Sequence, residues 1–286
     1  MFISTKSLSE SLENNILRVI DNELKGNLRF VGRCFGRFDM VAEFDEESAK
    51  VASYKVCKIQ EKAAKELRKI KDVSKDPICS SLMLCNEVFD EDILSHEDTD
   101  SKYPALRLYS FLYPRKPKID LVKILTQLID TRKSLKSING SASLFFSLSN
   151  YSFLLMISGN KFCKMFDEFM KFRAMTKDVF LESCTYVAIG IDKNGEMLKD
   201  LKCDNKKIKA YIFLKLKDGF GDINIQEGGI IKSIDKRFGW SDISLEVEAY
   251  TLYEIKRKIL DLREKYRDQI SNTSTLILPE KGGVIK

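Results

Sequence analysis

Two short turns combine glycine with an aspartate whose carboxylate could bind a ligand. They read Phe35-Gly36-Arg37-Phe38-Asp39 and Phe238-Gly239-Trp240-Ser241-Asp242. Glycine permits the backbone conformations of tight turns, and an aspartate beside it can cap backbone N–H groups. The same groups could instead hold the charged ends of a zwitterion at a domain interface, with N–H groups on its carboxylate and Asp39 or Asp242 on its ammonium. Both interpretations stay open from the sequence.

Aromatic residues offer a second kind of contact. Tyr109, Phe111 and Tyr113 alternate along one apolar segment, and the basic stretch 114–118 follows them. An alternating aromatic face beside lysines could stack single-stranded RNA bases, or it could pack against another part of the chain. Trp240 is the only tryptophan, and its position in a turn suggests either an interface or a cover for a sheet edge.

Catalytic and metal-binding constellations have no evident place. The only histidine, His96, lies in the acidic stretch 95–100, which could hold a metal but is more typical of a solvated connector. Neither a nucleophile–histidine set nor a phosphate-binding glycine loop is recognisable. We therefore expect no catalytic residues, no metal and no cofactor, and a protein that is not an enzyme.

The elements that must position these residues recur three times. Each turn window, with its counterpart Ser149-Asn150-Tyr151-Ser152, lies between two apolar segments and so predicts a hairpin. A helix follows each hairpin; in the third copy an apolar stripe recurs at spacings of three and four, and Thr251 with Glu254 forms a capping box. We predict further strands over 79–87, 105–113, 180–191, 208–216 and 273–278.

The resulting order is β-α-β-β-α-β, which predicts an α+β chain of tandem ferredoxin-like βαββαβ domains. Each would be an antiparallel sheet with its helices on one face. The predicted domains cover residues 1–89, 103–191 and 207–281. In the third, Gly219, Gly221, Gly228 and Gly229 stand where the first helix should be, so we expect that helix to be short or absent.

The third copy resembles the effector-binding domain of the Lrp/AsnC family of transcription regulators. The resemblance rests on the strand 210–217, the Phe238-Gly239-x-x-Asp242 turn, the strand 245–249 and the ending Thr273-Ser274-Thr275-Leu276-Ile277-Leu278. It implies pairing of domains through their sheets and an amino-acid-like effector near the turn. The implied ligand-binding residues are Gly36, Phe38, Asp39, Gly239, Trp240, Asp242, Thr273 and Thr275.

The family's DNA-binding helix-turn-helix has no counterpart, because the residues before the first hairpin read as one helix. We therefore do not expect direct DNA contact, although a DNA-binding partner protein fits the resemblance. The function that follows is a non-enzymatic regulatory protein that binds a small effector and acts through association. The alternatives are a single-stranded RNA-binding array, a purely structural assembly module, and an enzyme of a ferredoxin-like type without a recognisable motif.

Composition sets the remaining limits. The 286 residues are 44% hydrophobic and carry a net charge of +6 from 48 basic and 42 acidic side chains, a balance that does not indicate a nucleic-acid binder. Seven cysteines at irregular spacing suggest free thiols, and no apolar stretch reaches membrane-spanning length, so we expect a cytoplasmic protein. Apolar residues on both faces of the predicted strands also predict that two copies pair within the chain and that the odd copy forms a homodimer.

Overall fold

The computed structural model describes most of the chain and has an α+β fold with antiparallel sheets. The residues it describes are 1–4, 10–35, 38–68, 79–81, 85–87, 105–115, 120–147, 153–192, 194–202, 207–218, 223–236 and 240–279.

The first part of the chain, unit 1 (residues 1–81), alternates strands and helices in the predicted order. Its elements are β1 (Phe2–Ser4), α1 (Glu10–Leu24), β2 (Leu28–Phe35), β3 (Met40–Phe44), α2 (Ala49–Arg68) and β4 (Cys79–Ser81). The strands lie side by side in the order β4-β1-β3-β2. Apolar residues of α1 and α2 pack on one face of this sheet and form a buried core.

Unit 2 (residues 106–190) repeats this arrangement, and unit 3 (residues 208–279) keeps its strands. Unit 2 contains β6 (Leu106–Pro114), α3 (Leu121–Leu135) with the 3-10 turn η2 (Lys136–Ile138), β7 (Ser141–Ser147), β8 (Phe153–Gly159), α4 (Phe162–Met175) and β9 (Phe180–Gly190). Unit 3 contains β10 (Ile208–Leu216), β11 (Ile231–Lys236), β12 (Ile243–Ala249), α5 (Leu252–Lys265) and β13 (Ile270–Pro279). Their strand orders, β9-β6-β8-β7 and β13-β10-β12-β11, match that of unit 1 position by position.

The sequence predicts that the three turns are equivalent and that the first helix of unit 3 is short or absent. Gly36, Ser149 and Gly239 lie outside the described residues, but the strands that flank them are the second and third strands of their units in all three cases. Between β10 and β11, the described residues 217–218 and 223–230 contain no helix, as the glycines there predict.

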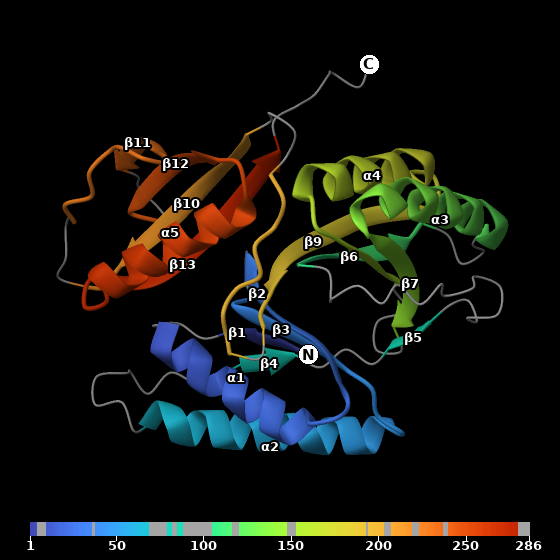
Figure 1. Cartoon of the computed structure of the whole chain (residues 1–286), viewed down its shortest axis with the longest axis horizontal. Coiled ribbons are helices and arrows are strands. Elements are labelled where there is room, and N and C mark those ends of the chain that lie inside the picture. Colours follow the sequence, from blue (N-terminus) through green and yellow to red (C-terminus); the bar gives the residue numbers. More distant parts are fainter. Residues whose placement is uncertain are drawn as a thin grey trace.

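Units 1 and 2 share one nine-stranded sheet that curls back on itself. Strand β2 of unit 1 pairs with β9 of unit 2, and β5 (Cys85–Glu87) pairs with β7 at the far edge. Only three residues separate β4 at one edge from β5 at the other, a chain length that spans at most about 15 Å. The two edges therefore lie close together, and helices α1 to α4 cover the outside (Figure 1).

The inner faces of units 1 and 2 meet through aromatic side chains. Phe2 on β1 lies 5.5 Å from Tyr109 and 5.8 Å from Phe111, measured between ring centroids, although β1 and β6 are four strands apart in the sheet. Phe38 and Tyr186 complete this cluster, with centroids 5.1 Å apart. The packing interpretation of the aromatic strand is therefore confirmed for Tyr109 and Phe111.

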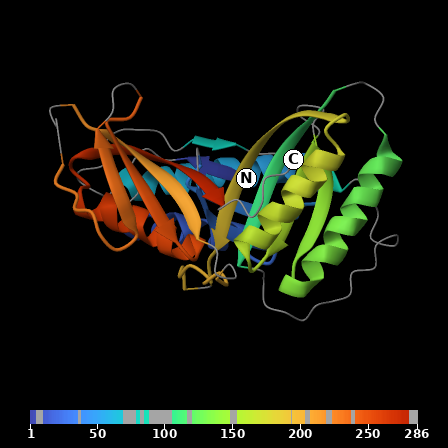
Figure 2. The same cartoon turned by 90° about the horizontal axis from the view of Figure 1, so that it is seen from above.

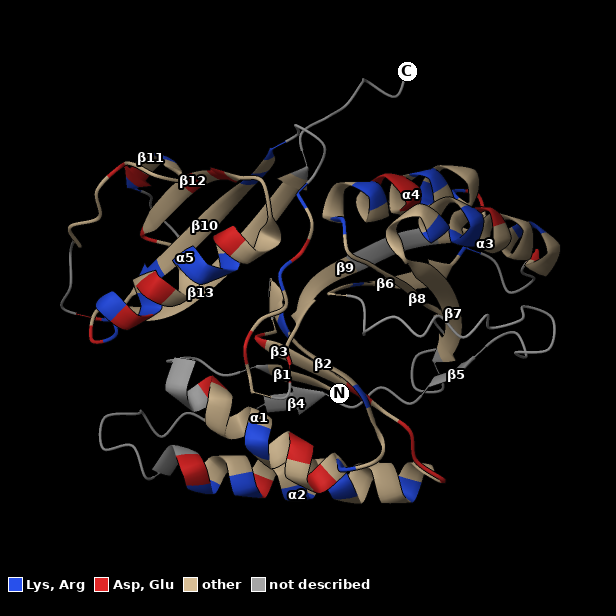
Figure 3. Cartoon of the chain, in the orientation of Figure 1, with Lys and Arg blue, Asp and Glu red and all other residues tan. Residues whose placement is uncertain are grey.

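Unit 3 forms a separate four-stranded sheet beside the curled one (Figures 1 and 2). Its helix α5 packs on its own sheet through Leu252, Ile255 and Ile259 and turns its other side toward unit 1. Charges of both signs are interspersed along α2, α3, α4 and α5, as expected for a solvated surface (Figure 3).

Two sequence predictions are wrong. The single strand predicted over 79–87 is two strands, because this segment serves both edges of the curled sheet: 79–81 pair with β1 and 85–87 pair with β7. Cys163 is disulfide-bonded, so the cysteines are not all free thiols, while Cys34 and Cys57 are free. Irregular spacing in sequence does not reveal which cysteines the fold brings together. No helix among the described residues is long and apolar enough to cross a membrane.

Candidate functional site

Asp39 of the first turn lies in a buried cluster of charges between unit 1 and unit 3. Both terminal nitrogens of Arg263, on α5, lie 3.2 Å from Oδ1 of Asp39. The Nε of Arg263 donates to Thr273 Oγ1 at 2.7 Å. The structure therefore brings together two predicted ligand-binding residues, Asp39 and Thr273, through an arginine that the sequence analysis did not single out.

Two side chains of unit 1 and one more from α5 complete this ionic cluster. Glu13 on α1 is fully buried and lies 2.7 Å from the Nε of Arg33 on β2 and 3.9 Å from Nη1 of Arg263. Lys256, also buried, donates its Nζ to the carbonyl oxygen of Cys34 at 2.7 Å. The cluster thus contains three basic and two acidic side chains, and α5 supplies two of the basic ones.

Burial dominates the electrostatics of this cluster. Loss of solvent raises the pKa of Glu13 and lowers the pKa of Lys256, and in both cases the neighbouring opposite charges act against that shift. Breaking such a network from one side leaves an uncompensated buried charge, which is strongly unfavourable. The cluster therefore fixes α5, and with it unit 3, against the turn of unit 1.

The remaining predicted site residues occupy other places. Phe38 packs in the aromatic cluster between units 1 and 2. Asp242 accepts a hydrogen bond from the backbone N–H of Leu216 at 2.7 Å and pairs with Lys215, which is the turn-stabilising role. Trp240 is 67% exposed and lies against Phe213 with centroids 4.8 Å apart. Thr275 is opposite Ile212 in the sheet of unit 3, and Gly36 and Gly239 lie outside the described residues.

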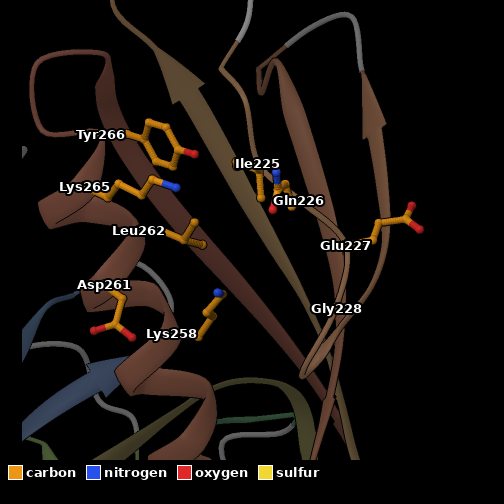
Figure 4. Close-up of a pocket in the computed structure, with 9 residues that line it drawn as sticks. All are labelled: Ile225, Gln226, Glu227, Gly228, Lys258, Asp261, Leu262, Lys265 and Tyr266. Atoms are coloured by element: carbon orange, nitrogen blue, oxygen red, sulfur yellow. The ribbon is translucent and has the colours of Figure 1, made fainter.

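A pocket of about 300 Å³ opens between α5 and the described residues 225–228, which contain no helix. One wall is formed by Lys258, Asp261, Leu262 and Lys265 on one side of α5, with Tyr266 directly after the helix. The other wall is the extended segment 225–228 (Figure 4). Tyr266 joins the two walls, since its hydroxyl donates to the carbonyl oxygen of Asn224. The volume lies at the lower end of the range for small-molecule sites.

The pocket combines charges of both signs with an apolar floor. Lys258, Lys265, Glu227 and Asp261 supply the charges, and Ile225 and Leu262 supply the apolar surface. Asp261 lies 3.8 Å from Arg257, whereas Lys258 and Glu227 form no ion pair with any side chain in the described part of the chain. Lys258 and Lys265 lie on the α5 wall of the pocket, whereas the carboxylate of Glu227 points away from α5 at the opposite rim (Figure 4).

No protein-family model matches the chain, and no curated protein is significantly similar to it in sequence. The likeness to Lrp/AsnC effector domains therefore rests on the motifs alone. Within the described residues, no group of three histidine, cysteine or acidic side chains is placed to hold a metal ion.

Most of the residues that form the ionic cluster and the pocket were not predicted from the sequence. The spacing of Lys256 and Arg263, seven residues apart on α5 and beside its apolar stripe, is the one signal that could have indicated a buried basic pair. Glu13 and Arg33 gave no signal, because charged residues on a helix and a strand are usually solvated.

Proposed function

We propose that this chain is a non-enzymatic regulatory protein, built from three ferredoxin-like copies, that binds a small amino-acid-like zwitterion and acts through association. The common strand order of the three units supports the ferredoxin-like assignment. Their likeness to Lrp/AsnC effector domains supports a regulatory role, in which a separate protein would contact DNA.

The pocket beside α5 is the observation that carries the ligand assignment. The ammonium groups of Lys258 and Lys265 can hold a carboxylate, and the carboxylate of Glu227, at the rim of the pocket, can turn inward to hold an ammonium group. Ile225 and Leu262 offer contact to an apolar side chain between those ends. An amino-acid-like zwitterion is the small ligand that needs all three features together.

The turn carboxylates are less suited to this role. Asp39 is already held by Arg263 in a buried cluster, so a ligand there would have to break that ion pair first. The pocket avoids this cost and uses the same helix. Because α5 carries the pocket residues on one side and Lys256 and Arg263 on another, a ligand that shifts α5 would also act on the turn of unit 1.

A thermal-shift screen of the full chain with the twenty amino acids tests the proposal. We expect one or a few of them to raise the melting temperature, and Lys258→Ala to abolish that rise. Lys133→Ala, which removes one exposed lysine of α3 far from the pocket, serves as the charge-matched control and should respond like the wild type. No response to any amino acid, or equal responses of both variants, would contradict the assignment.

A further inference from the structure

The sheet face of unit 3 that is turned away from α5 exposes large apolar side chains. It carries Tyr211 and Phe213 on β10 and Leu276 and Leu278 on β13, with Trp240 beside Phe213. Trp240 is 67% exposed, Leu276 is 50% exposed and Leu278 is 41% exposed. A contiguous apolar patch of this kind on a folded domain is costly in water and marks an interaction surface.

The register of the strands shows what covers the equivalent face elsewhere in the molecule. Tyr109 and Phe111 are the fourth and sixth residues of β6, as Tyr211 and Phe213 are of β10. Tyr109 is opposite Tyr186 on the fourth strand of its unit, and Tyr211 is opposite Leu276 on the fourth strand of unit 3. In unit 2 these residues are covered by Phe2 of unit 1.

The edge strands of unit 3 correspond to the strands by which units 1 and 2 pair with each other. Units 1 and 2 join at two places. The second strand of unit 1, β2, pairs with the fourth strand of unit 2, β9. The second strand of unit 2, β7, pairs with β5, which follows the fourth strand of unit 1 in sequence. In unit 3 the second strand β11 and the fourth strand β13 form the two edges of the four-stranded sheet. β11 lies at the outer edge, whereas β13 lies beside β2 of unit 1.

Charge on this face favours a protein of mixed charge over nucleic acid. Lys209 pairs with Glu246 at 2.6 Å, and Lys215 pairs with Asp242 at 2.9 Å, so the basic side chains already have acidic neighbours within the face. A two-fold contact uses one patch twice and therefore needs both signs on it, a requirement that this patch meets. An apolar centre with a charged rim is also the usual make-up of a protein interface.

We propose that two copies of this chain associate through the helix-free face of unit 3, as units 1 and 2 do within the chain. In that dimer the helix-free faces of the two copies meet, and Tyr211, Phe213, Leu276 and Trp240 are buried at its centre. The proposal does not depend on the pocket ligand, so either can fail alone.

Sedimentation equilibrium of the full chain at micromolar concentration tests this. The wild type should sediment at twice the chain mass of 32.9 kDa. Leu276→Glu places a charge at the centre of the contact and should weaken association about 100-fold or more. Leu121→Glu is the matched control, because Leu121 on α3 is similarly exposed, at 46%, and should leave the dimer intact.

Fluorescence of Trp240 gives a second readout, because it is the only tryptophan. On dilution of the wild type its emission should shift to the red as the dimer separates, and Leu276→Glu should show the red-shifted spectrum at every concentration. A wild type that is monomeric throughout overturns the proposal, as does a dimer that survives Leu276→Glu. A monomer whose spectrum shifts only when single-stranded RNA is added, in a salt-sensitive way, would assign the face to RNA instead.

Discussion

Units 1 and 2 on one side and unit 3 on the other use the same strand order in two different settings. In the first setting two helix-free faces close over an aromatic cluster, and the sheet edges pair with each other. In the second, the equivalent face keeps its aromatic residues but remains exposed in the single chain. The difference lies in the surroundings of the strand, since β6 and β10 carry Tyr and Phe at the same positions.

The sequence of a strand determines that both of its faces need a cover, whereas the surrounding elements determine what that cover is. Alternation of apolar residues on both faces predicts that a strand will be covered on both sides. It does not identify the cover, which for β6 is β1 of another unit, whereas Trp240 and Leu276 beside β10 stay exposed. This exposed face is the surface on which the proposed dimer rests.

The largest expected effect compares Tyr109→Ala with Tyr211→Ala. Tyr109 is 2% exposed, packs against Phe2, and donates its hydroxyl to Glu43 of unit 1. Its truncation leaves a cavity and removes one of the two partners of the Glu43 carboxylate, which keeps only Arg107 at 3.5 Å, and should lower the free energy of unfolding by about 3–5 kcal/mol. Tyr211→Ala should cost about 1 kcal/mol or less in the monomer. Urea unfolding at concentrations low enough to separate the subunits measures both.

Equal losses of unfolding free energy in the two variants would mean that the two faces are equally covered within one chain, and would contradict this prediction. If the loss of stability for Tyr211→Ala grows with protein concentration, the face of unit 3 is covered by a second copy of the chain.

The next comparison is between the two turn aspartates. Asp39→Asn removes one of the two carboxylates in the ionic cluster and leaves three basic side chains facing Glu13 alone, at a cost of about 3 kcal/mol. Asp242→Asn keeps an oxygen for the backbone N–H of Leu216 and loses only a partly exposed pair with Lys215, so the cost should be under about 1 kcal/mol. Chemical unfolding of both variants decides between them. Similar costs would show that the buried network adds nothing beyond a turn cap.

Local patterns predicted the elements of this fold well. The capping box of Thr251 and Glu254 marked the start of α5, and the alternation in β10 predicted its bounds from Ile208 to Leu216. The glycines between β10 and β11 predicted a first helix that is short or absent, and the described residues 217–218 and 223–230 contain none. These features depend on residues close together in sequence, so a single sequence contains the information.

Long-range features escaped prediction for a physical reason. The ionic cluster joins Glu13, Asp39 and Arg263, which lie more than 200 residues apart at the extremes, and no local pattern links them. The division of the segment 79–87 into two strands follows from the curl of the sheet, and that curl results from the packing of units 1 and 2. The turn motif located Asp39 but could not show that Arg263 would occupy its carboxylate.

The connection from unit 2 to unit 3 gives the smallest and most specific test, through pH. Asp200 accepts hydrogen bonds from the backbone N–H groups of Leu252 and Tyr253, at 2.8 and 3.1 Å, and so holds the start of α5. Burial raises the pKa of Asp200 from 3.8 to about 6. The folded protein therefore binds this proton more tightly than the unfolded chain, and the contribution of Asp200 to stability is lost as pH rises from about 4 to about 6.

Asp200→Asn cannot titrate, so the free energy of unfolding of the wild type minus that of the variant isolates this contribution. We expect the difference to fall by at most about 3 kcal/mol between pH 4 and pH 7, measured by urea unfolding. Subtraction of the variant also removes the background from Glu13, whose raised pKa acts in the same direction. A difference that stays flat, or rises with pH, would mean that the hydrogen bonds to α5 stabilise the carboxylate more than burial penalises it. The attachment of unit 3 would then grow stronger above pH 6.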